Sequence, residues 1–323
     1  MRRLRLIRGA TEIPFMAWRR GALIGSAAAG ALSLILVLVL GLNFGIDFRG
    51  GTMIEARTPE PVAISEVRGA VSGLGLGDVS VQAFGAETDV LIRVEAQPGD
   101  GDAQMAVVET VRGALEAAIP GTEFRRVEVV GPKVSGELIV AGALALAAAV
   151  AAILVYIWLR FEWQFSVGAV AALVHDVVLT VGVFALVRLE FNLSIIAALL
   201  TIIGYSLNDT VVVFDRVREN LRKYKQKPLE GVLDLSINET LSRTLMTSVT
   251  TLIALVALYL LGGEVIRGFT FAMIWGVVIG TYSSVFVAAA VLLGLGVTRD
   301  WSSESGDGPG GGPSGVQFGG AQV

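Results

Sequence analysis

The stretch LTIIGYSLNDTVVVFDRVREN, residues 200–220, combines a membrane-spanning degree of hydrophobicity with an aspartate, Asp209, in its middle. A carboxylate in the hydrocarbon of a bilayer costs at least ~2.5 kcal/mol, so such residues are rare and usually functional. The next long apolar segment, residues 244–261, is preceded by Arg243. An acid and a base on consecutive spans predict a membrane protein that moves protons or ions.

The composition of the whole chain supports a membrane location. The 323 residues are 54% hydrophobic, with a mean hydropathy of +0.69, which is too apolar for a soluble domain of this length. Several apolar runs approach or exceed the ~20 residues that a spanning helix needs. The six predicted spans are residues 21–42, 138–159, 165–187, 193–214, 244–261 and 266–297. The sequence therefore predicts a polytopic α-helical membrane protein with six transmembrane helices.

The composition also argues against several functional classes. The chain has no cysteine and a single histidine, so disulfides and thiolate sites are excluded and a histidine-rich metal site is disfavoured. No GxxxxGK[ST] loop is present for nucleotide hydrolysis. We expect no enzymatic activity, no cofactor and no nucleic-acid partner.

Basic residues predict the orientation. Arginines cluster in residues 1–20, and arginines and lysines cluster again in residues 216–227, between the fourth and fifth spans. By the positive-inside rule both regions, and with them both termini, are cytoplasmic, and residues 43–136 lie outside. A signal peptide is the alternative for the N-terminus, but the apolar run is too long and is not followed by a small-residue cleavage site. We interpret it as a retained anchor.

The outer segment, residues 43–136, is long enough to fold. Its periodicity predicts strands at 52–57, 79–84, 90–95 and 123–130 and helices at 62–74 and 103–119. This β-α-β-β-α-β order is that of a small α+β, ferredoxin-like domain between the first two spans. The preceding GLNFGIDFRGG, residues 41–51, is interpreted as a flexible exit from the membrane. The remaining divisions are residues 137–298 for the other spans and 299–323 for a Gly/Ser/Pro-rich tail predicted to be disordered.

A polar face on the fourth span is the main candidate site. Thr201, Tyr205 and Asp209 are spaced by four residues and share one helical face. Asn208 lies beside that face. Because the fifth span runs antiparallel, Arg243 enters from the same side and is expected at a similar depth. The alternative interpretation of the two charges is a static salt bridge that fastens two helices.

Other polar residues support this candidate site or serve packing. Thr247 belongs to a run of hydroxyls after Arg243 that can bond across helices or line a hydrated path. His175 and Asp176, in the third span, are either relay members or a packing contact. Asp215 lies where the fourth span leaves the membrane, next to charged residues expected to face lipid headgroups. The GxxxG of residues 276–280 predicts a close helix contact.

Several long stretches, in order, carry a family resemblance. They are GLNFGIDFRGG, HDV in the third span, IGYSLNDTVVVFDRVREN, INETLSRTLMTSVTTL, LYLLGGEVIRGF and GTYSS. The chain resembles the SecF family, membrane subunits of the bacterial protein-export accessory complex, which form one half of the twelve-span resistance-nodulation-division (RND) architecture. The resemblance implies a bacterial cytoplasmic (inner) membrane protein that pairs with SecD. It further implies use of the proton-motive force to assist preprotein movement through SecYEG after SecA has acted.

The same resemblance implies that Asp209 of NDT and Arg243 of SRT belong to the proton site. Two other functions stay open at this point. One is an RND-type small-molecule or lipid exporter half, although the single outer segment is small for a drug-sized cleft. The other is a non-transporting assembly subunit whose charges only mate with a partner.

Overall fold

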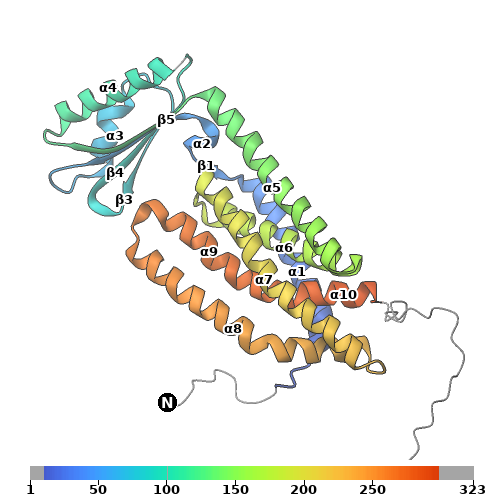
Figure 1. The fold of residues 1–323 in the computed structure, drawn as a ribbon. Coiled ribbons are helices and arrows are strands. Elements are labelled where there is room, and N and C mark those ends of the chain that lie inside the picture. The colour runs from blue at the N-terminus through green and yellow to red at the C-terminus, as the bar shows by residue number, and fades with distance from the viewer. Residues whose placement is uncertain (1–10, 100, 298–323) are drawn as a thin grey trace, which may run out of the picture.

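The computed structural model describes residues 11–99 and 101–297 (Figure 1). The first arginines of the N-terminus and the tail predicted to be disordered lie outside the described residues. Six long apolar helical segments are present in the described part, which confirms the predicted number of spans. They are α1 (Arg19–Leu40), α5 (Pro132–Arg160), α6 (Trp163–Val187), α7 (Leu193–Lys223), α8 (Leu229–Leu261) and α9 (Glu264–Ser283), the last continuing through a π-helical turn η2 (Ser284–Ala288) into α10 (Ala289–Leu295).

Two of these helices extend well beyond the predicted spans. The stretch predicted as a basic loop is mostly helical, because α7 continues to Lys223 and α8 begins at Leu229. The early turns of α8 are amphipathic, with Val232, Leu233 and Ile237 buried against the bundle. Hydropathy marks only the purely apolar part of a helix, so an amphipathic extension is missed.

The polar face of that extension binds the N-terminal segment of the chain. A short 3-10 turn, η1 (Phe15–Trp18), precedes α1. The backbone N–H of Met16 donates to Asp234 Oδ1 at 2.8 Å, and Asn238 both accepts from Ile13 N at 3.0 Å and donates to Ile13 O at 2.9 Å. These bonds join the start of α1 to α8.

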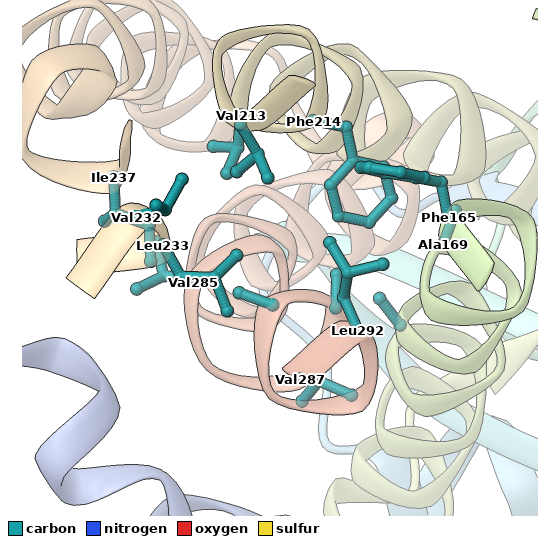
Figure 2. Close-up of a cluster of buried hydrophobic side chains, with 14 of the residues drawn as sticks. Phe165, Ala169, Val213, Phe214, Val232, Leu233, Ile237, Val285, Val287 and Leu292 are labelled. Atoms are coloured by element: carbon teal, nitrogen blue, oxygen red, sulfur yellow. The ribbon is translucent and has the colours of Figure 1, made fainter. Parts of the chain in front are cut away.

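The interior of the bundle is built by α6, α7 and the α9–α10 helix. Figure 2 shows one part of this core, where Phe165 and Phe214 lie edge to face with ring centroids 5.1 Å apart. The predicted GxxxG contact is confirmed. A Cβ on Gly276 would collide with the Ile202 side chain of α7, and one on Gly280 would lie 3.0 Å from Ser206 Cβ. The absence of side chains there lets α9 lie directly against α7.

The outer domain is a four-stranded antiparallel sheet with two helices on one face (Figure 1). Its elements are β2 (Gly51–Arg57), α3 (Ile64–Ser72), β3 (Val79–Phe84), β4 (Ala86–Val94), α4 (Gly101–Ala118) and β5 (Glu123–Val130). The element order is that expected from the sequence, and the strand order is β3-β4-β2-β5. Its separate core is formed by strand residues such as Ile54 and Ile92 and by helix residues such as Val111 of α4.

The GLNFGIDFRGG segment is ordered, so its interpretation as a flexible exit is wrong. Its residues form β1 (Asn43–Phe44), which pairs in parallel with β6 (Glu190–Phe191), followed by a turn of helix, α2 (Ile46–Arg49). Asp47 Oδ2 accepts a hydrogen bond from the first backbone N–H of α7, that of Leu193, at 2.7 Å. Gly51 adopts φ +120°, and its missing side chain allows close approach to the Val94 carbonyl. Gly45, Gly50, Gly51 and Asp47 therefore serve close contacts in an ordered connection.

An ion pair completes the attachment of the outer domain. Arg93 of β4 pairs with Glu190 of β6, and both side chains are largely buried. Burial raises the pKa of Glu190, while the nearby Arg93 guanidinium acts in the opposite direction. The outer domain is thus held to the outer ends of the bundle by paired strands, a helix cap and this ion pair.

The tight α7–α9 contact predicts a specific sensitivity. Gly276→Ala should destabilise the protein by about 1–3 kcal/mol, because Ile202 must shift to admit the methyl group. Gly204→Ala is the matched control, since a Cβ at this helical position in α7 meets open space. Thermal unfolding of the detergent-solubilised protein, followed by tryptophan fluorescence, measures both variants. Equal melting temperatures for the two would show that the glycine contact is not required.

Candidate functional site

Asp209 is buried in α7 and only partly satisfied. Its side chain is 3% exposed, and its Oδ2 atom is buried with no hydrogen-bond partner among the described residues. Arg243 of α8 is close enough to act on it electrostatically. No ion pair or hydrogen bond joins the two side chains within the described part of the chain. The static salt bridge considered as an alternative is therefore not formed in this structure.

Asp176 of α6 is, by contrast, a fully satisfied acid. It is completely buried, and its Oδ2 atom accepts hydrogen bonds from Ser206 of α7 at 2.7 Å and Ser283 of α9 at 2.8 Å. His175 Nδ1 lies 3.0 Å from its other oxygen, Oδ1. The carboxylate thus joins the three inner helices at one point. A buried carboxylate with hydrogen-bond partners on both oxygens holds those neighbouring side chains in place.

Sequence reasoning missed Ser206 and Ser283 as partners of Asp176. Both lie in stretches that carry the family resemblance, Ser206 within IGYSLNDT and Ser283 within GTYSS. Serine is common in membrane helices as a packing residue, so composition alone does not mark these two. The sequence offered one indication: an aspartate buried in the third span needs hydrogen-bond donors, and serines on neighbouring spans can supply them.

His175 connects this cluster to α1. Its ring lies 6.0 Å from the ring of Tyr282, measured between centroids. The Tyr282 hydroxyl donates to Ala22 O at 3.1 Å and lies 3.0 Å from Ser26 Oγ. The Nε2 atom of His175 is buried without a partner among the described residues. Although neighbouring residues project about 100° apart on a helix, His175 and Asp176 contact each other and belong to one cluster.

The remaining predicted residues divide between cross-helix contacts and the bundle surface. Tyr205 donates to Thr251 Oγ1 of α8 at 3.3 Å, whereas Thr247 bonds the carbonyl of Thr244 in its own helix at 2.9 Å. Thr201 and Asn208 are exposed on α7. With the exposed Arg243 they place polar side chains on the outer surface of the helical bundle.

Asp215 does not join the buried acids. It is exposed and pairs with Arg160 of α5 at 3.3 Å. Six residues of helix separate it from Asp209, a rise of about 9 Å. No group of three or more potential metal ligands of the His, Cys, Asp or Glu type is found within the described residues.

Comparison with known proteins identifies the family. The family described as "Protein export membrane protein SecD/SecF, C-terminal" matches residues 110–298, and the "SecD/SecF GG Motif" matches residues 35–59. The chain belongs to the SecD/SecF family. The glycine motif covers the end of α1, β1, α2 and β2, which is the ordered connection between membrane and outer domain described above.

Curated relatives and solved structures agree with this assignment. The protein translocase subunit SecF of Cereibacter sphaeroides is 54% identical over 304 residues, covering 92% of this chain and 94% of the relative. That of Rhodobacter capsulatus is 49% identical over 310 residues, covering 92% and 93%. The crystal structure of SecDF, a translocon-associated membrane protein from Thermus thermophilus, matches 88% of this chain with a TM-score of 0.78 and 34% identity.

The solved relatives differ from this chain in length and among themselves in shape. This chain spans 39% of the length of the Thermus protein. A second SecDF crystal structure, in a super-membrane-facing form, covers the same 88% of this chain at 33% identity, but its TM-score is 0.62. The two solved structures are nearly equally identical to this chain in sequence, and by TM-score this chain is more similar to the first.

The Asp176 cluster predicts a strong effect of its serine donors. Replacing both Ser206 and Ser283 by alanine should destabilise the protein by about 2–4 kcal/mol, because a buried carboxylate then loses two donors. Ser166→Ala is the matched control, since this buried α6 hydroxyl has no partner among the described residues. Thermal unfolding in detergent compares them. A double variant as stable as the control would rule out the cluster as a fastening point.

Proposed function

We propose that this chain is the SecF half of a SecD–SecF complex that uses the proton-motive force to assist preprotein movement through SecYEG, with Asp209 as the proton-carrying group. The supporting observation is the contrast between two buried acids. Asp176 has donors on both oxygens, whereas Asp209 keeps a buried oxygen without a partner in the described structure. An unsatisfied carboxyl is the one whose protonation state can change without breaking the core.

Arg243 supplies the second part of this proposal. Burial favours the neutral form of a carboxyl, and a nearby guanidinium favours its ionised form. Arg243 acts on Asp209 without a direct bond and is itself exposed. Proton loading on Asp209 would cancel the attraction, and release would restore it. Each proton that crosses ~100 mV supplies about 2.3 kcal/mol for the accompanying movement.

His175 and Asp176 have a structural role in this proposal. Their cluster holds α6, α7 and α9 together and so provides a fixed frame for Asp209. Tyr205 and Thr247 line the α7–α8 side of the same region, and Thr201 and Asn208 lie on its outer surface. Asp215, paired with Arg160, belongs to the end of the helix rather than to the relay.

The partners follow from the family and from the exposed polar face. Relatives named SecF match this chain over nearly their full length, whereas the solved SecDF chain is much longer. A second half is therefore needed to complete that architecture, and we assign it to SecD, with SecYEG, the preprotein and, functionally, SecA as further partners. The name shared by the relatives favours protein translocation over export of small molecules.

The same proposal fixes the orientation. The excess of arginine and lysine between α7 and α8 supports a cytoplasmic location for that end and for both termini, in the bacterial inner membrane. The outer domain is then periplasmic. Its antiparallel order β3-β4-β2-β5, with both helices on one face, supports the ferredoxin-like assignment.

Asp209→Asn tests the carrier role. Asparagine preserves size and part of the hydrogen bonding but cannot ionise. We expect normal insertion and SecD binding, with loss of proton flux and of proton-dependent export stimulation in inverted vesicles. Asp215→Asn makes the same chemical change on the same helix at an exposed site, and should retain most activity. Full stimulation by Asp209→Asn would remove this residue from the mechanism.

Arg243→Lys separates charge from geometry. Lysine keeps the positive charge but loses the planar fork that binds a carboxylate through two parallel bonds. If the released carboxylate is recaptured in one defined geometry, the variant should insert normally and lose most of its proton-coupled activity. The measurement is proton flux and export stimulation in the same vesicles. A lysine variant with full activity would show that charge alone suffices.

A further inference from the structure

A charged cavity lies at the end of the bundle opposite the outer domain, where α5 ends and α7 continues. Its volume is about 550 Å³. The lining residues are Arg160 of α5 and Asp215, Arg218, Glu219, Arg222 and Lys223 of α7. Neither the Asp176 cluster nor Asp209 lines this cavity, so the proposed proton chemistry leaves it unexplained.

The charges of this cavity favour an anion. Its two carboxylates are already paired, Asp215 with Arg160 at 3.3 Å and Glu219 with Arg216 at 2.9 Å. Arg218 donates to the backbone carbonyl of Arg160 at 3.3 Å, which holds its guanidinium at the mouth of the cavity without neutralising it. Lys223 is exposed and lies over the Tyr224 ring. Positive charge is therefore left over after internal pairing.

Aromatic residues show that this cavity lies at the membrane surface. Tyr156, Trp158 and Trp163, around the turn from α5 to α6, are 60%, 60% and 53% exposed. Exposed tyrosine and tryptophan at the ends of spanning helices mark the level of lipid headgroups. The cavity borders the same turn through Arg160, so an anion bound in it lies at phosphate depth.

A second cavity extends from this site along the bundle. Its volume is about 400 Å³, and it shares Arg160, Asp215 and Glu219 with the first. Its walls include the side chains of Tyr156 on α5 and Val211 and Val212 on α7, which offer some apolar surface. The rest of its lining is charged or polar and includes the ion pair of Arg216 with Glu239. It also reaches Arg243 of α8. A charged mouth joined to a partly apolar groove suits an amphiphile better than a small ion.

We propose that these adjoining cavities bind an anionic glycerophospholipid, with its phosphate at Arg218 and Lys223 beside the Arg160–Asp215 pair, and with the start of an acyl chain against Tyr156, Val211 and Val212. Arginine binds a phosphate through two parallel hydrogen bonds, and basic pockets between spanning helices are known lipid-headgroup sites. Because the groove reaches Arg243, the bound lipid lies beside the arginine assigned to the proposed proton site. Lipid composition would then adjust the proton-coupled activity.

Native mass spectrometry of the complex with its SecD partner tests this site, using phosphatidylglycerol and phosphatidylcholine as probes. We expect phosphatidylglycerol to be retained and phosphatidylcholine to be lost. Arg218→Gln combined with Lys223→Gln should weaken phosphatidylglycerol binding at least about tenfold. Lys223→Gln alone should show part of that loss. Because Lys223 is exposed, this single variant should fold normally and keeps the test valid if the double variant misfolds.

Lys225→Gln combined with Lys227→Gln is the matched control. It removes the same charge from the same connection, but neither lysine lines the cavity. Unchanged phosphatidylglycerol binding in this control supports the site. An equal loss of binding in both double variants would show that the lipid is held by general electrostatic attraction to the basic surface and not in this cavity. Displacement of the lipid by millimolar inorganic phosphate would identify a free-anion site instead. Equal retention of phosphatidylcholine, or no lipid retention, would overturn the proposal.

Discussion

The hydrogen-bonded carboxylate of Asp176 is the interaction on which the membrane part of this protein depends. Burying a charge in a bundle surrounded by hydrocarbon is tolerable only when donors from several directions surround it. Ser206, Ser283 and His175 supply those donors from α6, α7 and α9. The missing side chains of Gly276 and Gly280 let α9 approach α7 closely enough for this to happen. The close packing of α9 on α7 and the hydrogen bonding of Asp176 therefore depend on each other.

The Asp176 cluster fixes the position of α7 and therefore the surroundings of Asp209. Held on α7 a single helical turn from Ser206, it is buried but keeps an oxygen without a donor among the described residues. One acid thus holds three helices together through its hydrogen bonds, while the other has one oxygen without a donor among the described residues. The carrier role proposed for Asp209 needs both conditions, since a carboxyl whose protonation also disrupted the core could not cycle.

The connection between the helical bundle and the outer domain is also ordered by specific hydrogen bonds and a buried ion pair. The glycine motif pairs β1 with β6, caps α7 through Asp47 and leaves β2 at the edge of the membrane. The Arg93–Glu190 pair adds a buried charge contact between the sheet and the loop before α7. Any shift of α7 relative to α6 therefore acts on the outer domain through a short, ordered link. An ordered connection of this kind transmits position between the two parts in a way that a flexible linker would not.

Hydropathy and alternation along the chain sufficed to predict the six spans and the β-α-β-β-α-β order. Contiguous motifs sufficed to predict the close contact at residues 276–280 and the family resemblance, because all of these properties are local in the sequence. They did not reveal the amphipathic start of α8 or the order in GLNFGIDFRGG. Those depend on what packs against them. Nor could they separate Asp176 from Asp209. The donors to Asp176 come from positions 30 and 107 residues away along the chain. Only the tertiary structure decides which buried acid is satisfied, because hydrogen bonding depends on distance in space and not along the sequence.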